Sequence, residues 1–387
     1  MNGNPVIHIQ FRMMSLRILL TGLPVVAAVQ FSVIAQSHPM PRRDNIILIV
    51  ADGLAANDLS CYGQTQFQTP HLDQLAAGGI RFTNYFAGGV AGPPARAALM
   101  LGKDTSRLSD ADFSLTSHDV TVAELLKSSG YSTCLIGEWN LGDENSPGAP
   151  WRQGFDEFAG YFDPADAQNV YPDFLWKYDV TYNPSENRND VFNGRETLPY
   201  NLDGKKQGYV PDLLVQWTIN DAQNHQPDQF NHYQPFFVAV NETIPGNGNR
   251  EVSTDAPFSE EPWPQAEKNR AATIARLDAA IGKLLGKLSS MDEISNTVIF
   301  LTSDTVPKKG GGIDPKFFHE NSGPDDLRVP FIVYCPGKIP AGQVSGVPCS
   351  ARDFLPTTAA LAYVQTPKES EGTSLLPYIF GREAKRH

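Results

Sequence analysis

Cysteine, net positive charge and long hydrophobic runs are all scarce in this sequence. Only 4 of the 387 residues are cysteines, which excludes a small fold held together by disulfides. Lys and Arg number 31 against 43 Asp and Glu, a formal net charge of −12. Nucleic acids and anionic membranes favour clustered Lys and Arg, so we expect no nucleic-acid partner. An anionic ligand would need local positive charge to overcome this repulsive background.

The most apolar stretch lies near the N-terminus and is too interrupted for a membrane span. Arg12 and Arg17 precede an apolar stretch over residues 18–34, which Pro24, Gln30 and Ser32 interrupt. A spanning helix needs about 20 consecutive apolar residues. Basic residues, a short apolar segment and the small residue Ala35 are typical of a signal peptide. The sequence therefore predicts a signal peptide over residues 1–35 and export to the periplasm or the extracellular space. If this segment is not cleaved, it would instead anchor the chain to a membrane.

The rest of the chain alternates between strand and helix patterns, and it contains no internal repeat. Apolar, β-rich runs predict strands at Asn45–Val50, Ile80–Phe86, Ser132–Ile136, Phe236–Val240, Thr297–Leu301 and Phe331–Tyr334. Capping residues and helical periodicity predict helices at Thr69–Ala77, Thr121–Ser129, Glu261–Ser289 and Asp353–Ala362, the last of these being the final helix. Residues 141–210 and 241–260 are rich in Gly, Pro, Asn and Asp, which predicts long loops. The alternation predicts an α/β fold with a mostly parallel central sheet.

Two carboxylates directly follow predicted strands. Asp52 comes after the run NIILIVA, and Asp304 comes after the run TVIFLTS. In open α/β sheets ligands bind beyond the carboxyl ends of the strands, and two carboxylates brought together there would suit a hard divalent cation. Taken singly, an Asp after a buried strand more often caps a turn or a helix. The residue pattern alone therefore favours the capping interpretation for either residue taken singly.

Several sequence blocks lie along the chain in a characteristic order and spacing. They include TPHLDQLAAGGIRFTNYF (69–86), GYSTCLIGEWNLG (130–142), QGFDEFAGYF (153–162), LRVPFIVYCPGKI (327–339) and DFLPTTAALA (353–362). In order and spacing these blocks resemble the arylsulfatase-type bacterial members of the sulfatase family, within the alkaline-phosphatase superfamily. The resemblance implies an alkaline-phosphatase-like sandwich with helices on both faces of the sheet. This sandwich would form one domain over residues 45–381, between a linker at 36–44 and a tail at 382–387. The small C-terminal antiparallel subdomain of relatives is expected to be missing.

The resemblance also implies a nucleophile that this sequence lacks. Family members convert a Cys or Ser in Cys/Ser-x-Pro-x-Arg to formylglycine, whose hydrated form attacks sulfur. Here the segment reads Gly-Pro-Pro-Ala-Arg, with Gly92 at the nucleophile position and Arg96 retained. No formylglycine can form at Gly92. Arg96 is equally open to two interpretations, a retained anion contact or a helix-surface arginine.

The family's metal and leaving-group positions are also altered. The resemblance implies a calcium or similar divalent ion held by an early Asp-Asp pair and a late Asp-Asn pair. The early pair keeps Asp52 but has Gly53, and the late pair keeps Asp304 but has Thr305. Losing two of four ligands predicts greatly weakened metal binding.

Two further positions of the family's anion-binding apparatus are substituted. Glu138 stands where the family has Lys, and Asn140 stands where it has His. Near a sulfate, a carboxylate in place of an ammonium group is repulsive.

These losses predict a catalytically inactive, exported pseudosulfatase. One alternative is a metal-dependent sulfate- or phosphate-ester hydrolase with chemistry relocated to Asp52 and Asp304, and another is a glycan- or protein-binding module. The expected ligand is a sulfated or other anionic glycan, or a small ester. The cysteines show no metal-binding spacing, and Cys134 and Cys335, on predicted strands, are expected to be small core residues.

Overall fold

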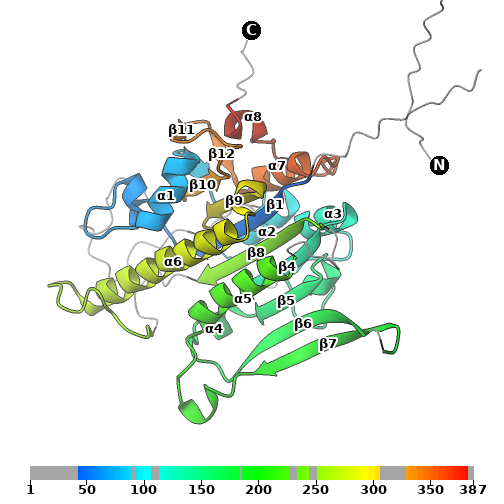
Figure 1. Cartoon of the computed structure of the whole chain (residues 1–387), viewed down its shortest axis with the longest axis horizontal. Coiled ribbons are helices and arrows are strands. Elements are labelled where there is room, and N and C mark those ends of the chain that lie inside the picture. The colour runs from blue at the N-terminus through cyan, green and yellow to red at the C-terminus, as the bar shows by residue number, and fades with distance from the viewer. Residues whose placement is uncertain are drawn as a thin grey trace, which may run out of the picture. The chain divides into compact units, whose positions relative to one another are not determined.

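A ten-stranded mixed sheet forms the centre of the fold (Figure 1). The structure is a computed structural model, and it describes residues 42–88, 92–105, 113–183, 185–225, 233–243, 251–305 and 328–381. The central strands run parallel in the spatial order β9 (Thr297–Thr302), β1 (Asn45–Asp52), β8 (Phe236–Thr243), β4 (Ser132–Glu138) and β5 (Glu157–Tyr161). The predicted mostly parallel α/β sheet is confirmed.

Antiparallel strands extend the sheet on both sides of this parallel centre. On one side β10 (Phe331–Tyr334) pairs with β9 and with β2 (Ile80–Phe82), and β11 (Gln343–Ser345) pairs parallel with β2. On the other side β6 (Phe174–Asn183) pairs with β5 and with β7 (Arg188–Thr197). A separate small sheet joins β3 (Tyr85–Phe86) to β12 (Cys349–Ser350).

Helices cover both faces of the sheet, because successive residues of a buried strand point to opposite faces. On one face, Ile46 and Leu48 of β1 belong to a core cluster with residues of α2 (Pro93–Leu101), α3 (Val122–Ser128) and α7 (Phe354–Leu361). On the other face, Ile47 and Ile49 belong to a second cluster with α1 (Pro70–Gly78), α5 (Val210–Asn224) and α6 (Gln265–Ser290). In Figure 1, α5 and α6 cross in front of the sheet and α2 lies behind it.

Short helices fill the connections between these elements. Two are single α-turns, α4 (Pro164–Ala167) and α8 (Leu376–Ile379). The 3-10 helices are η1 (Ala56–Asp58), η2 (Ser60–Tyr62), η3 (Pro150–Arg152), η4 (Leu202–Gly204), η5 (Ile294–Asn296) and η6 (Ala351–Asp353). Within the described ranges, no helix combines the length and the hydropathy that a bilayer crossing requires. The predicted signal peptide and the predicted tail lie outside those ranges.

Local sequence signals set several of these boundaries. The capping box before α3 is formed: Thr121 Oγ1 accepts from the amide of Glu124 at 3.1 Å, and Glu124 Oε2 accepts from the amide of Thr121 at 2.9 Å. The predicted apolar stripe of α6, from Ile274 to Leu288, is buried. The helix starts at Gln265 rather than at the predicted Glu261, because Pro264 lies at its N-cap.

Four of the sequence-based predictions differ from the structure. The predicted loop at 141–210 contains β5, β6 and β7 as well as the start of α5. Residues 241–243 of the predicted loop at 241–260 belong to the end of β8, whereas residues 251–260 contain no helix or strand. The β6–β7 hairpin escaped detection because most of β7 is exposed, so its residues carry no apolar alternation.

The other two errors concern the ends of elements. The predicted strand at 80–86 divides into β2 and β3, which belong to different sheets. The predicted last helix at 353–362 corresponds to α7, but α8 follows it. Strand β3 and helix α8 are too short to show a periodic pattern of their own in the sequence.

Candidate active site

Asp52 and Asp304 meet at the carboxyl edge of the sheet, as predicted. They follow adjacent parallel strands: β1 ends at Asp52, and Asp304 lies two residues beyond β9. Thr305 contributes its hydroxyl, which donates to Asp52 Oδ1 at 2.7 Å. Thr305 therefore still contacts the aspartate, although it replaces a predicted metal ligand.

Arg96 occupies the centre of this cluster and is completely buried. Its Nε donates to Asp304 Oδ2 at 3.1 Å, and its Nη2 lies 2.9 Å from the same oxygen. Its Nη1 donates to Glu138 Oε1 at 3.1 Å and to the carbonyl of Trp139 at 2.9 Å. Its Nη2 is also 3.9 Å from Asp52 Oδ2. The alternative of a helix-surface arginine is therefore wrong, because the guanidinium is enclosed by carboxylates.

Gly137 directs Glu138 into the cluster. Alternation along β4 places Cys134 and Ile136 on the α5/α6 face, and continued alternation would place Glu138 there as well. Gly137 has a φ of +101°, which breaks the alternation. A Cβ at this position would lie 2.0 Å from the carbonyl oxygen of Asn241. Both the backbone conformation and the packing therefore require glycine, and the turn at Gly137 lets Glu138 reach Arg96 on the other face.

The two substituted glycine positions and Asn140 also have distinctive backbones. Gly92 is the N-cap of α2, one turn before Arg96, with φ +66° and ψ −144°. Gly53 has φ +82°, and its carbonyl accepts from Arg270 Nη2 at 2.9 Å. Asn140, which is half-buried, has φ +54°, a left-handed conformation that Asn tolerates better than most residues. The conformations at Gly92 and Gly53 favour glycine, so the backbone suits the residues now present.

The cluster has more acidic than basic groups. Three carboxylates (Asp52, Glu138 and Asp304) surround one guanidinium. Burial, followed by repulsion from Asp304, raises the pKa of Asp52 to about 7, despite attraction to Arg96 and the hydrogen bond from Thr305.

Arg96 itself stays charged. Burial alone would lower the pKa of Arg96, but attraction to the three carboxylates outweighs it and raises that pKa above its ordinary value. The oxygen Oδ1 of Asp304 is buried and receives no hydrogen bond from any residue that the structure describes. Among the described residues, this cluster therefore carries a net negative charge at neutral pH.

Comparison with known proteins identifies the family. The sulfatase family model matches residues 44–364, most of the chain. This protein belongs to the sulfatase family. It is 30% identical to arylsulfatase A of Homo sapiens over 375 residues, which cover 90% of this chain and 70% of that protein. It is 29% identical to N-acetylgalactosamine-6-sulfatase of Sus scrofa, covering 89% of this chain and 68% of that protein.

A solved structure supports the same assignment. The crystal structure of Ps i-CgsB in complex with k-i-k-neocarrahexaose superposes with a TM-score of 0.73 at 25% identity, covering 88% of this chain and 77% of that one. The alkaline-phosphatase-like sulfatase fold expected from the motifs is thereby confirmed.

The sulfatase family generally uses a divalent cation, and the residues present here do not fit the family's four-ligand set. Two of the four side chains remain. Arg96 contacts Oδ2 of Asp304 and lies near Oδ2 of Asp52, while Thr305 donates to Oδ1 of Asp52. Ca²⁺ requires six to eight oxygen ligands. Of the four oxygens of this carboxylate pair, Asp304 Oδ1 has no donor among the described residues, and Asp52 Oδ2 has only the 3.9 Å approach of Arg96.

Two contributors to this site were not identified from the sequence. One is the carbonyl of Trp139, which accepts from Arg96. The other is Asn241 of β8, whose Nδ2 donates to the carbonyl of Glu138 at 2.8 Å. A backbone acceptor leaves no mark in a sequence pattern. The glycine that precedes Glu138 within an apolar strand was the available signal for a change of direction.

Proposed function

We propose that this sulfatase-family protein is an exported pseudosulfatase, which binds a ligand at its sheet edge without hydrolysing sulfate esters. The observation that carries the proposal is the state of Arg96. It is the remaining basic side chain of the nucleophile motif, and Glu138 and Asp304 both hold its guanidinium inside the protein. An arginine enclosed in this way has no free face to offer a sulfate.

The loss of the nucleophile supports the same proposal. Gly92 has no side chain to attack sulfur, and the preceding residues 87–91 are Ala, Gly and Val. Its φ and ψ lie close to the region that is essentially restricted to glycine, so a Cys there would be strained by about 1–3 kcal/mol. The local backbone therefore opposes a simple return to the family's nucleophile.

The charge of the site defines the proposed ligand. The names of the relatives point to sulfated sugars, and Ps i-CgsB was crystallised with a neocarrahexaose, so a glycan is the proposed ligand class. Three carboxylates against one guanidinium would repel a sulfate at this edge, because burial weakens solvent screening. We therefore propose that a glycan contacts this edge through uncharged hydroxyls, with its desulfated form preferred. The basic residues Arg12 and Arg17 and the apolar stretch that follows them support the proposed export.

An activity screen combined with glycan binding tests the proposal. The purified full chain, with added Ca²⁺, Mg²⁺ or Mn²⁺, is assayed on sulfate and phosphate monoesters, next to the same reactions without protein as the background. The expected result is no turnover above that background and tighter binding of a desulfated oligosaccharide than of its sulfated form. Metal-dependent sulfate release, or a preference for the sulfated form that weakens with salt, would overturn the proposal.

A second candidate is a metal-dependent ester hydrolase that uses Asp52 and Asp304. The observation in its favour is Oδ1 of Asp304, which receives no hydrogen bond from any described residue and is therefore an available oxygen ligand for a metal ion. In this case the screen gives phosphate- or sulfate-ester hydrolysis that Asp52→Asn abolishes. Absence of bound divalent metal at the Asp304 edge would remove its basis.

A further inference from the structure

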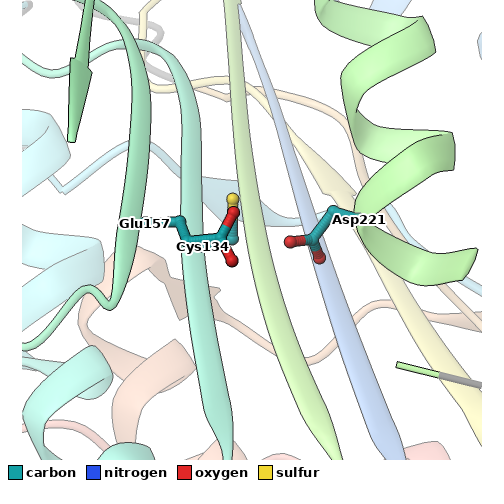
Figure 2. Close-up of side chains that lie close together, drawn as sticks. All are labelled: Cys134, Glu157 and Asp221. Carbon is teal, nitrogen blue, oxygen red and sulfur yellow. The ribbon is translucent and has the colours of Figure 1, made fainter. Parts of the chain in front are cut away.

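A second acidic cluster lies near the amino end of β4, far along the strand from Glu138. It consists of Cys134 (β4), Glu157 (β5) and Asp221 (α5), whose ligand-type atoms all lie within 4.8 Å of one another. Figure 2 shows the three side chains pointing toward a common point between the sheet and the helix. This cluster is separate from the Arg96 site and is not explained by the proposed function.

Strand register and helix packing together create the cluster. Cys134 and Glu157 are register partners across the parallel β4–β5 pair, so their side chains lie on the same face of the sheet. Asp221 belongs to the buried stripe of α5, together with Leu214 and Thr218, and this stripe packs onto that face. The three ligand atoms are therefore positioned by rigid secondary structure rather than by loops.

The cluster lacks a buried internal cation. Asp221 is 6% exposed, and its Oδ2 receives no hydrogen bond within the described part of the chain. His225 is the basic side chain paired with it, but its Nδ1 is 3.7 Å from that oxygen and 2.9 Å from the carbonyl of Asp221. Lys177, on β6, is 2.8 Å from Asp179 and is engaged there. A buried carboxylate with an unused oxygen is costly unless a cation or a proton satisfies it.

The cluster opens into a cavity that could admit an ion. The cavity has a volume of about 230 Å³, and its lining includes the three cluster residues together with Lys177, Trp217 and Asn220. Burial raises the pKa of the Cys134 thiol well above its ordinary value and that of Asp221 to about 6. A bound divalent ion reverses this effect, because it favours the thiolate and the carboxylate and releases their protons.

We propose that Cys134, Glu157 and Asp221 bind a divalent transition-metal ion of the zinc class. One thiolate and two carboxylates are ligands that Zn²⁺ accepts, whereas Ca²⁺ and Mg²⁺ require oxygen ligands alone. Three protein ligands would leave a fourth tetrahedral position open to a water molecule or a small exogenous ligand.

Cobalt substitution tests this site directly. The full chain is stripped with a chelator under reducing conditions and titrated with Zn²⁺ by calorimetry, and with Co²⁺ by absorption spectroscopy. The expected result is binding of one Zn²⁺ per chain at this site, together with a thiolate-to-cobalt charge-transfer band in the near ultraviolet. Because that band requires a cysteine ligand, it separates this site from the carboxylates beside Arg96.

Two variants and one control make the test decisive. Cys134→Ser should abolish the charge-transfer band, and Glu157→Gln, at an exposed position that tolerates the change, should weaken Zn²⁺ binding about 10-fold or more. Cys61→Ser, at a half-buried thiol outside the cluster, should change neither. No Zn²⁺ binding tighter than about 1 mM, or a cobalt band that survives in folded Cys134→Ser, would overturn the proposal. If Cys134→Ser does not fold, unchanged affinity in Glu157→Gln overturns it equally.

Discussion

Strand β4 contributes to two acidic clusters that satisfy their charge in opposite ways. Near its carboxyl end, Glu138 joins Asp52 and Asp304 around Arg96, a fully buried internal cation. Near its amino end, Cys134 joins Glu157 and Asp221, and the nearest pairing with a basic side chain is the 3.7 Å approach of His225. A cluster that contains its own cation has little affinity left for an external one. A cluster without one must take up protons or a metal ion.

The two clusters lie on opposite faces of one strand because of a single glycine. Cys134 follows the ordinary alternation and faces α5. Gly137, with φ +101°, turns the last residue of the strand toward α2, which carries Arg96. The two clusters therefore differ in whether a basic side chain compensates the carboxylates, and each cluster can be perturbed separately.

The largest expected effect comes from removing the internal cation. Arg96→Ala leaves the buried carboxylates of Glu138 and Asp304 and the partly buried Asp52 uncompensated, and we expect the free energy of unfolding to fall by about 3–5 kcal/mol. Urea denaturation followed by circular dichroism measures the change. The matched control is Arg276→Ala, which removes the more exposed pair with Asp212 and should cost less than about 1 kcal/mol. Equal losses in the two variants would mean that Arg96 does not compensate the cluster.

Supplying a cation to the second cluster should stabilise the protein. With free Zn²⁺ at about 100 times its Kd, we expect the free energy of unfolding to rise by about 2.7 kcal/mol, because the ion binds the folded chain preferentially. Thermal denaturation with and without Zn²⁺ measures the shift. Glu157→Gln should reduce the stabilisation, whereas Glu251→Gln, at an exposed glutamate paired with Lys206, should leave it intact. A zinc-induced shift that is the same in both variants contradicts the assignment.

The raised pKa of Asp52 gives the first cluster a defined pH dependence. The folded protein retains this proton up to about pH 7, whereas the unfolded chain loses it near pH 3.8. The stability that Asp52 contributes is therefore fully present at low pH and is lost as the pH rises between these two values. Asp52→Asn has no such proton to lose. Its advantage over wild type in free energy of unfolding should therefore grow by about 1–3 kcal/mol as the pH rises from 5 to 8.

Chemical denaturation of chelator-treated protein at the two pH values measures this difference. Asp179→Asn, which alters an acidic residue paired with Lys177 on the β6–β7 hairpin, serves as the control and should show little change. If the difference in free energy of unfolding between wild type and Asp52→Asn is the same at both pH values, Asp52 does not titrate in this range.

The smallest effect concerns the hydroxyl that bridges the two strand ends. Thr305→Val removes the 2.7 Å hydrogen bond to Asp52 while keeping the shape of the side chain, so we expect a loss of about 1 kcal/mol. It should also raise the pKa of Asp52 further, because this hydrogen bond lowers it. The midpoint of the pH-dependent stability difference reports that change. A downward shift of the midpoint would contradict the role given to Thr305.

Much of the central fold was predictable because its signals are local. The apolar runs of β1, β9 and β10 and the capping box of α3 each lie within a few residues, and the structure has all four elements. The β6–β7 hairpin was not predictable in this way, because its ten register pairs stabilise strands with few buried side chains. Helix α5 was missed for a related reason, since polar residues interrupt its buried stripe.

The candidate site was partly predictable. Asp52 and Asp304 come together as expected, since the carboxyl ends of neighbouring parallel strands meet at one edge. The burial of Arg96 was not predictable, because a helical arginine near an anion-binding position and one on a surface have the same local sequence. Its pairing with Glu138 depends on the backbone at Gly137.

The sequence by itself determined the sulfatase family, the absence of a nucleophile at Gly92 and the loss of two metal-binding side chains. These follow from residue identity, because a side chain that is absent can do no chemistry in any fold. Tertiary structure alone decided that Arg96 pairs with Glu138 and Asp304, which are 42 and 208 residues away along the chain. It alone also decided that Cys134 meets Glu157 and Asp221. Those contacts depend on strand register, one left-handed glycine and the packing of α5, which no local pattern specifies.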